Sequence, residues 1–227
     1  FTRGGSRAPA YNSIVAAGEN ACILHYYRND AEVKDGDLIL IDAGCEYKYY
    51  ASDITRTFPA NGTFNPQQKA IYELVLKAQD SAIDAVQPGA PWDAPHNASV
   101  RVITQGLIKL GLIEGTLAKA IKAEVYRDFY MHRVGHWIGI DVHDVGDYKI
   151  DEKWRLLEPG MVTTIEPGIY IAPDNKRVPK KWRGIGVRIE DDVLVTKNGN
   201  RVLTTGIPKT VAEIETFMAQ AKQKRAA

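Results

Sequence analysis

Three of the chain's five histidines lie close together, in the stretch MHRVGHWIGIDVHD at residues 131–144. Histidine titrates near neutrality and ligates metals, so the cluster could bind an ion or transfer protons, although any single ring could equally be structural. In an extended segment His132 and His136 would share a side and His143 would not, and the intervening glycines argue against a long helix. We therefore expect one histidine ligand flanked by two proton donors, rather than a three-histidine metal site.

Four acidic residues could supply the rest of a metal site. Asp42 ends the apolar run DLILID, residues 37–42, and Glu166 directly follows MVTTI. A carboxylate at the end of a buried strand is costly unless it is paired or bound to a metal. Asp53 and Glu190 lie in two further β-like segments, YYASDITRTF and GVRIEDDVLV. A turn cap or a salt bridge is the alternative for any one of them.

A short internal repeat relates these acids. DGDLILIDAG and EPGMVTTIEPG each place a carboxylate six residues after a glycine, with another glycine two residues further on. Each copy is followed by a β segment that carries a second acid. The corresponding residues are Gly36, Asp42 and Gly44 in the first copy and Gly160, Glu166 and Gly168 in the second. Unless this short match is chance, two related halves converge on one pseudo-symmetric centre.

Four carboxylates and one imidazole form an oxygen-rich ligand set. Such a set suits hard or borderline divalent ions, Mn²⁺ in particular, better than a thiolate zinc site would. Four negative charges match two such ions, which bridging carboxylates hold roughly 3.5–4 Å apart in two-metal hydrolases. A water between the ions would lose a proton and become the nucleophile.

Two basic residues could complete the site. Arg188 precedes Glu190 by two positions, so on a strand both share a face and the arginine could orient a ligand carboxylate. An exposed arginine on an edge strand is the alternative. His25 ends the apolar run of ACILHYY and could join the site, whereas His96, in the polar APHNAS, is interpreted as structural.

The elements that position these residues form one α+β domain over residues 1–227, since no low-complexity linker divides the chain. Asn65 and Pro66 open a helix that ends near Val86, and a capping box at Thr210–Glu213 opens a C-terminal helix. The remaining predictions are helices at about 95–110 and 116–125, a strand at 37–42, and β runs at 161–171, 186–196 and 201–205.

Composition excludes several classes of protein. Lys plus Arg (29) balances Asp plus Glu (28), which argues against a nucleic-acid partner. No apolar run approaches the roughly 18 residues of a membrane span, and no signal peptide is visible at the start. Two cysteines give no disulfide framework, so we expect a cytoplasmic protein. The chain starts at Phe1, which suggests a longer parent.

Four segments together resemble one family, the proline-specific metallopeptidases of the pita-bread fold. They are LIDAGCEYKYYASDITRTFP, MHRVGHWIGIDVHD, LEPGMVTTIEPGIYIAP and RGIGVRIEDDVLVT. The similarity runs from about Tyr11 to the C-terminal helix and is greatest to the Xaa-Pro aminopeptidases. It implies a curved antiparallel sheet covered by helices, and hydrolysis of the bond between an N-terminal residue and a following proline. It also implies two metal ions, usually Mn²⁺, with Co²⁺, Zn²⁺ or Fe²⁺ as other candidates.

The resemblance also assigns residues. The implied metal ligands are Asp42, Asp53, His136, Glu166 and Glu190, with Asp53 and Glu190 bridging. The implied catalytic residues are His25, His132, His143, Glu166, Tyr170 and Arg188. Among these, His132 and His143 would contact substrate and support proton transfer, His25 would line the substrate site, and Tyr170 would lie near the metals. Arg188 would support a ligand carboxylate, and Glu166 would also act as general base.

The family pattern further implies a separate N-terminal domain, absent here together with the opening of the catalytic domain, and a homodimer or homotetramer for the full-length protein. One alternative is a prolidase, which has the same ligands but cleaves Xaa-Pro dipeptides; Trp137, in GHW, favours the aminopeptidase. A methionine aminopeptidase fits the RIED context poorly. Another alternative is a metal-free relative, acting as a hydrolase or a binding protein, but such relatives have typically lost ligands that are all present here.

Overall fold

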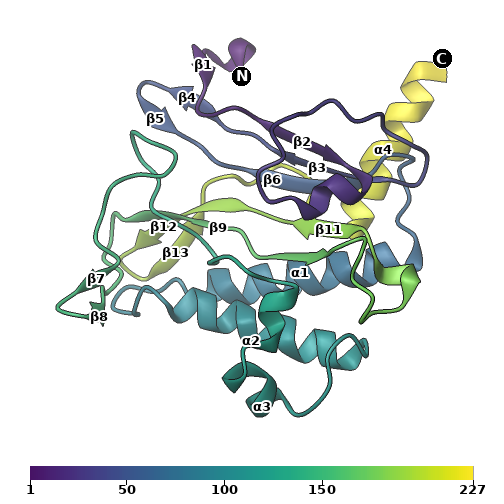
Figure 1. Cartoon of the computed structure of the whole chain (residues 1–227). Helices are drawn as coiled ribbons and strands as arrows, with labels where there is room; N and C mark the ends of the chain where they lie inside the picture. Colours follow the sequence, from purple (N-terminus) through teal and green to yellow (C-terminus); the bar gives the residue numbers. More distant parts are fainter. Residues whose placement is uncertain (227) are drawn as a thin grey trace.

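The computed structural model describes residues 1–226, in which antiparallel strands are stacked on a pair of long helices (Figure 1). One three-stranded sheet has the order β2 (Ile14–Ala17), β3 (Leu38–Asp42), β6 (Thr55–Pro59). A second has the order β9 (Val162–Ile165), β12 (Asp191–Thr196), β13 (Gly199–Val202). The other pairings are β10 (Gly168–Ile171) with β11 (Ile185–Arg188), β7 (Lys149–Ile150) with β8 (Lys153–Trp154), and the small sheet β1 (Ala8–Pro9), β4 (Cys45–Tyr47), β5 (Tyr50–Ala51).

The helices begin where the sequence predicts. Asn65 accepts hydrogen bonds from the amides of Gln67 and Gln68 in a capping box that opens α1 (Pro66–Asp84). Thr210 and Glu213 form the predicted reciprocal box before α4 (Val211–Ala226). The others are α2 (Ala94–Lys109), α3 (Leu117–Lys122) and short 3₁₀ turns at Thr2–Gly4, Gly18–Cys22, Val125–Asp128 and Lys180–Trp182.

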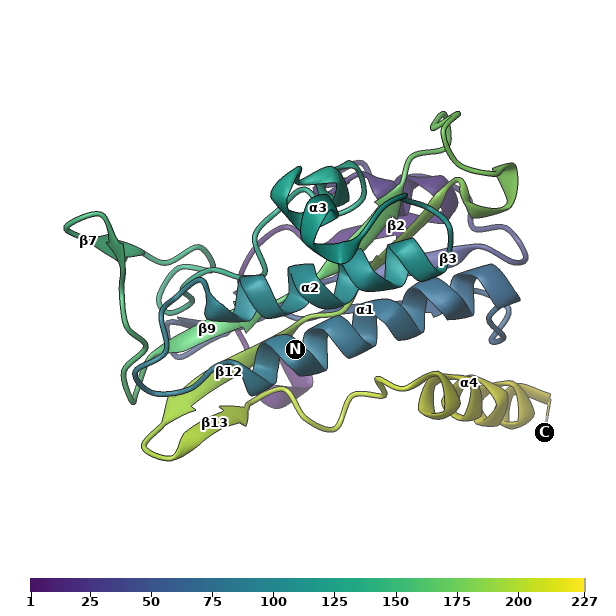
Figure 2. The same cartoon turned by 90° about the horizontal axis from the view of Figure 1, so that it is seen from below.

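The strands form layers above the helices. In Figure 1 the β2–β3–β6 sheet lies above β9, β11 and β12, with α1 and α2 beneath them, and Figure 2 shows α1 and α2 side by side. The main core fills the space between the helices and β10–β11, where Ile71, Ile103, Ile169 and Val187 are fully buried. No helix within residues 1–226 is both long and apolar enough to cross a bilayer.

Two of the predicted β runs are interrupted at the acids they carry. The run at 161–171 breaks at Glu166–Pro167, and the run at 186–196 breaks at Ile189–Glu190. The pairing register is nevertheless continuous across the breaks, because Gly168 faces Arg188 and Ile165 faces Asp191. Glu166 and Glu190 therefore oppose each other, and proline, which lacks an N–H, cannot continue the ladder beside them.

One smaller prediction also needed correction. The last strand lies at Gly199–Val202 rather than 201–205, because the turn after β12 is tight and β13 pairs back at once. The histidine stretch is not a regular strand, but residues 134–138 lie along the free edge of β9. The Glu166 amide donates to the Val134 carbonyl, the Thr164 amide donates to the His136 carbonyl, and Trp137 forms an isolated bridge with Thr163.

The two halves of the chain meet along β6. The Glu190 amide donates to the Thr55 carbonyl at 3.0 Å, and the Thr57 hydroxyl donates to the Arg188 carbonyl at 2.9 Å. Arg56 donates from Nη1 to the Glu190 carbonyl at 2.6 Å. We call these contacts between β6 and residues 188–190 the seam. The seam positions the acids of both halves. The repeat is only partly preserved in the topology, because β3 is central in its sheet while its counterpart β9 is at an edge.

Candidate metal centre

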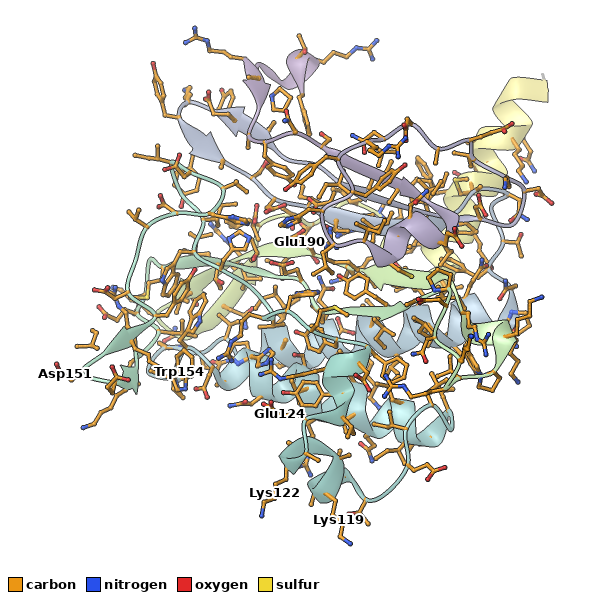
Figure 3. The ribbon with its side chains drawn as sticks, viewed as in Figure 1. Lys119, Lys122, Glu124, Asp151, Trp154 and Glu190 are labelled. Carbon is orange, nitrogen blue, oxygen red and sulfur yellow. The ribbon has the colours of Figure 1, made fainter. Side chains whose placement is uncertain are left out.

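A cavity of about 660 Å³ opens beside the seam and contains the predicted site. All five predicted ligands line it, together with four of the five other predicted site residues; Tyr170 is not part of the lining. They are Asp42, Asp53, His136, Glu166 and Glu190, then His25, His132, His143 and Arg188. Figure 3 shows Glu190 between the two strand layers. The structure therefore brings together residues that are up to about 160 positions apart in the sequence.

The donor atoms are close enough to share ions. Asp53, His136 and Glu190 each offer one ligand atom, and these atoms lie within 4.8 Å of one another. His136 Nε2 is 3.5 Å from both Asp53 Oδ2 and Glu166 Oε1. Tyr11 links Asp42 to these residues. Its hydroxyl oxygen lies 2.5 Å from Asp42 Oδ1 and 2.5 Å from Asp53 Oδ1.

The orientation of the His136 ring suits metal binding. Its Nδ1 lies 2.9 Å from the Trp137 carbonyl, which can only accept a hydrogen bond, so Nδ1 carries the proton. Nε2 then presents a lone pair to the acids, as ligating histidines do. Without a metal, burial lowers the pKa of His136, but its hydrogen bond to Asp53 and the charge of Glu166 outweigh burial and raise the pKa to about 9.

The acids are crowded and desolvated. Burial, and then repulsion from Asp53, Glu166 and Asp42, raise the pKa of Glu190 well above its ordinary value. Burial raises the pKa of Glu166 to about 7, and it also raises that of Asp42. Asp53 is the exception, because hydrogen bonds from His136 and Tyr11 outweigh its burial and lower its pKa. Divalent cations would relieve this repulsion, so the residues fit a metal centre built from oxygen ligands.

Arg188 is buried at 3% exposure, which excludes the edge-strand alternative. Its Nη2 donates to Asp42 Oδ2 at 2.7 Å, and its Nη1 donates to the Tyr170 hydroxyl at 3.0 Å. The guanidinium thus fixes the orientation of one predicted ligand and of the predicted tyrosine. Burial, with Arg188 opposing it, raises the pKa of Tyr170 to about 12, so the phenol stays protonated near neutrality.

The other histidines occupy different environments. His132 Nδ1 lies 2.7 Å from the Arg133 carbonyl, so its Nε2, 2.9 Å from the Tyr170 hydroxyl, is the acceptor. Burial lowers the pKa of His132 to about 3, so the ring is neutral in the unliganded site; its predicted part in proton transfer stays a prediction. His143 is exposed, with its ring centroid 4.4 Å from that of His136, and His25 is exposed at the cavity wall.

Sequence reasoning missed several residues that support the acids. Thr55 donates to Glu190 Oε2 at 2.6 Å, and the Tyr11 hydroxyl lies between Asp42 and Asp53. Behind the site, Asp191 accepts from Arg56, Lys209, Thr204 and Gln79. Thr55 could have been found, because it follows Asp53 by two positions on the same strand face. Tyr11 gave no signal, since it precedes any periodic segment.

Two glycines permit close backbone approach at the site. A Cβ on Gly44 would lie 1.5 Å from the Ser52 carbonyl oxygen, and one on Gly135 would lie 1.9 Å from that of Thr164. Neither position tolerates a side chain without backbone movement. Gly44, two residues after Asp42, thus keeps the Asp53 segment close, and Gly135 keeps His136 against β9.

Comparisons with known proteins agree with this geometry. The model of metallopeptidase family M24 matches residues 1–197. The Xaa-Pro aminopeptidase of Haemophilus influenzae is 56% identical over 218 residues, which are 96% of this chain and 50% of that protein. The structure of Pseudomonas aeruginosa aminopeptidase PepP is 68% identical with a TM-score of 0.97, covering 98% of this chain and 50% of that one. Escherichia coli aminopeptidase P with the inhibitor Pro-Leu is 50% identical with a TM-score of 0.95, over the same two shares.

The chain belongs to metallopeptidase family M24, and its fold is the pita-bread fold. It spans about half the length of the curated relatives it matches.

Proposed function

We propose that the protein is an Xaa-Pro aminopeptidase that uses two Mn²⁺ ions held by Asp42, Asp53, His136, Glu166 and Glu190. The observation that carries this proposal is the convergence of five ligand side chains on one cavity, with donor atoms of Asp53, His136 and Glu190 within 4.8 Å. Four carboxylates match the charge of two divalent ions, and the oxygen-rich set suits manganese. Asp53 and Glu190, which are the most buried of the acids, are the bridging ligands in this proposal.

The two ions would neutralise the acids and activate water for attack on a peptide carbonyl. The protein's own residues prepare the site around them. Glu166, which lines the cavity with its carboxylate 3.5 Å from His136 Nε2, is placed to accept and return a proton. Arg188 holds Asp42 and Tyr170 in place, and His132 accepts a hydrogen bond from Tyr170. His143 and His25 present exposed rings to the cavity and would contact the bound peptide.

The substrate in this proposal is a peptide with proline in second position. Both relatives at 50 and 56% identity are Xaa-Pro aminopeptidases, which supports this specificity over that of a prolidase. The Pro-Leu inhibitor of the Escherichia coli enzyme begins with proline, as would the product of cleaving before proline.

The test is a cleavage assay of the complete protein after metal removal and reconstitution with Mn²⁺. Ala-Pro-Leu should lose its alanine, Ala-Pro should be hydrolysed far more slowly, and Ala-Ala-Leu should resist. Elemental analysis should find about two Mn²⁺ per chain. Cleavage of the dipeptide alone would assign a prolidase, and failure to bind any transition metal after reconstitution would assign a metal-free relative.

A further inference from the structure

One end of the cavity has no part in the metal centre. Its wall is formed by Trp92, Tyr148 and Trp154, and two cations, Arg133 and Lys149, line it as well. The rings of Trp92 and Tyr148 lie with their centroids 4.9 Å apart. Figure 3 shows Trp154 on the β7–β8 hairpin, well away from Glu190 in the strand layers. The cavity is therefore acidic at one end, and aromatic and basic at the other.

Both cations pack on the same indole. The Arg133 guanidinium carbon is 5.0 Å from the Trp154 ring centroid, and Lys149 Nζ is 4.8 Å from that centroid. Lys149 and Trp154 face each other directly across the hairpin, which fixes the lysine stem against the ring. Arg133 directly follows His132, so the same backbone stretch carries a site histidine and one of these cations.

These charges are poorly neutralised by the protein itself. Lys149 Nζ is 4.0 Å from Glu152, whose side chain is 97% exposed and therefore well screened. Among the side chains that the structure describes, Arg133 takes part in no salt bridge. Two like charges within about 5 Å of one ring centroid repel each other, and an anion bound beside them would relieve part of that repulsion. A carboxylate matches the planar donor fork of arginine.

We propose that Arg133 and Lys149, held on Trp154, bind a carboxylate carried by the part of the peptide that follows the proline. The inference rests on the proposed function, because it extends the substrate from the acids of the metal centre toward the β7–β8 hairpin. The aromatic wall contacts the apolar part of the leaving peptide, and the cations select its charge. The carboxylate is the C-terminus of a short peptide or the side chain of an acidic residue, and both present the same group.

The first experiment measures binding. Isothermal titration calorimetry on the complete Mn²⁺-loaded protein compares Pro-Leu with its uncharged amide, Pro-leucinamide. The free acid should bind about fivefold more tightly, the size expected for one or two partly exposed ion pairs. The ratio of the two affinities, Pro-Leu over Pro-leucinamide, should approach one in Arg133→Gln and in Lys149→Gln. In the wild type the same ratio should decrease in 0.5 M salt. Lys153→Gln, which removes a neighbouring charge of the same hairpin outside the cavity lining, should keep the wild-type ratio.

The second experiment identifies the source of the carboxylate and separates the two proposals. The values of kcat/KM are compared for Ala-Pro-Leu and its amide, and for the amides of Ala-Pro-Glu and Ala-Pro-Gln. A preference for the first pair alone assigns the C-terminus, and a preference for Glu over Gln assigns an acidic side chain. Cleavage of every peptide without an acid preference, or a preference that persists in Arg133→Gln, overturns this inference and leaves the proposed function standing. Cleavage of none overturns the proposed function, and this inference with it.

Discussion

Glu190 and Asp191 are neighbours in sequence and are both almost fully buried. Their side chains point to opposite sides of the strand, Glu190 toward the cavity and Asp191 away from it, and the groups around the two carboxylates differ. The carboxylate of Asp191 is 2.7 Å from Arg56 and 3.1 Å from Lys209, and also accepts from Thr204 and Gln79. That of Glu190 accepts only from Thr55 and, within the described part of the chain, forms no salt bridge. The protein therefore supplies cations to Asp191 behind the strand. The Glu190 carboxylate, on the cavity side, has no such contact, and a divalent ion bound there would neutralise it.

The largest expected effect comes from removing a proposed metal ligand that lines the cavity. Asp53→Ala should lower peptide cleavage by more than about a thousandfold, because a two-metal centre contributes several kcal/mol to stabilising the transition state. Metal content measured on the same sample should fall as well. Asp84→Ala, which removes an exposed acid at the end of α1, should keep both, and His96→Ala should keep activity. An Asp53→Ala enzyme with normal turnover would remove Asp53 from the centre.

The next effect tests the two faces directly. In metal-free protein, Asp191→Asn should lower the free energy of unfolding by about 3–5 kcal/mol, because it leaves Arg56 and Lys209 with an uncompensated buried charge. Glu190→Gln, the same change one residue earlier, should cost little or should stabilise, because it removes a repelled carboxylate. Urea denaturation of both variants gives the comparison. Equal losses from the two variants would show that the faces do not differ.

His96 represents a third way of burying an ionisable group, since it stays neutral. Burial, and then Arg133 and Arg127, lower its pKa to about 4. The unfolded chain takes up a proton at this ring near pH 6.5 and the folded one only near pH 4, so acid favours unfolding. Between those values the free energy of unfolding should fall by up to about 3 kcal/mol, with no such contribution above pH 6.5.

The measurement for His96 is the stability of metal-free wild type and of His96→Gln at pH 7 and pH 5. Metal-free samples exclude the loss of ions in acid as a cause. The wild type should lose more stability than the variant between the two pH values. A parallel decrease in both proteins would mean that His96 does not control this dependence.

The features that could be predicted from the sequence are those formed by residues close together in the chain and those that recur in the internal repeat. The spacing of Asp42 and Glu166 from their glycines located two acids that the structure places at the cavity, and the capping residues located the helices. The partners of these acids were not predictable, because Arg56 meets Asp191 and Thr55 meets Glu190 across more than 130 positions. The breaks at Glu166 and Glu190 were also missed, although Pro167 and Gly168 are disfavoured inside strands and could have indicated the first of them.

The seam along β6 has a consequence for folding. Its contacts close loops of more than 130 residues, so they form late, after α1 and α2 have acquired their local turns. Asp42 and Asp53 must then approach Glu166 and Glu190 before any ion can be shared between the halves, and the repulsion of four carboxylates opposes that final docking. We therefore expect the acids of the site to slow the joining of the two halves, and we expect divalent ions present during folding to speed it.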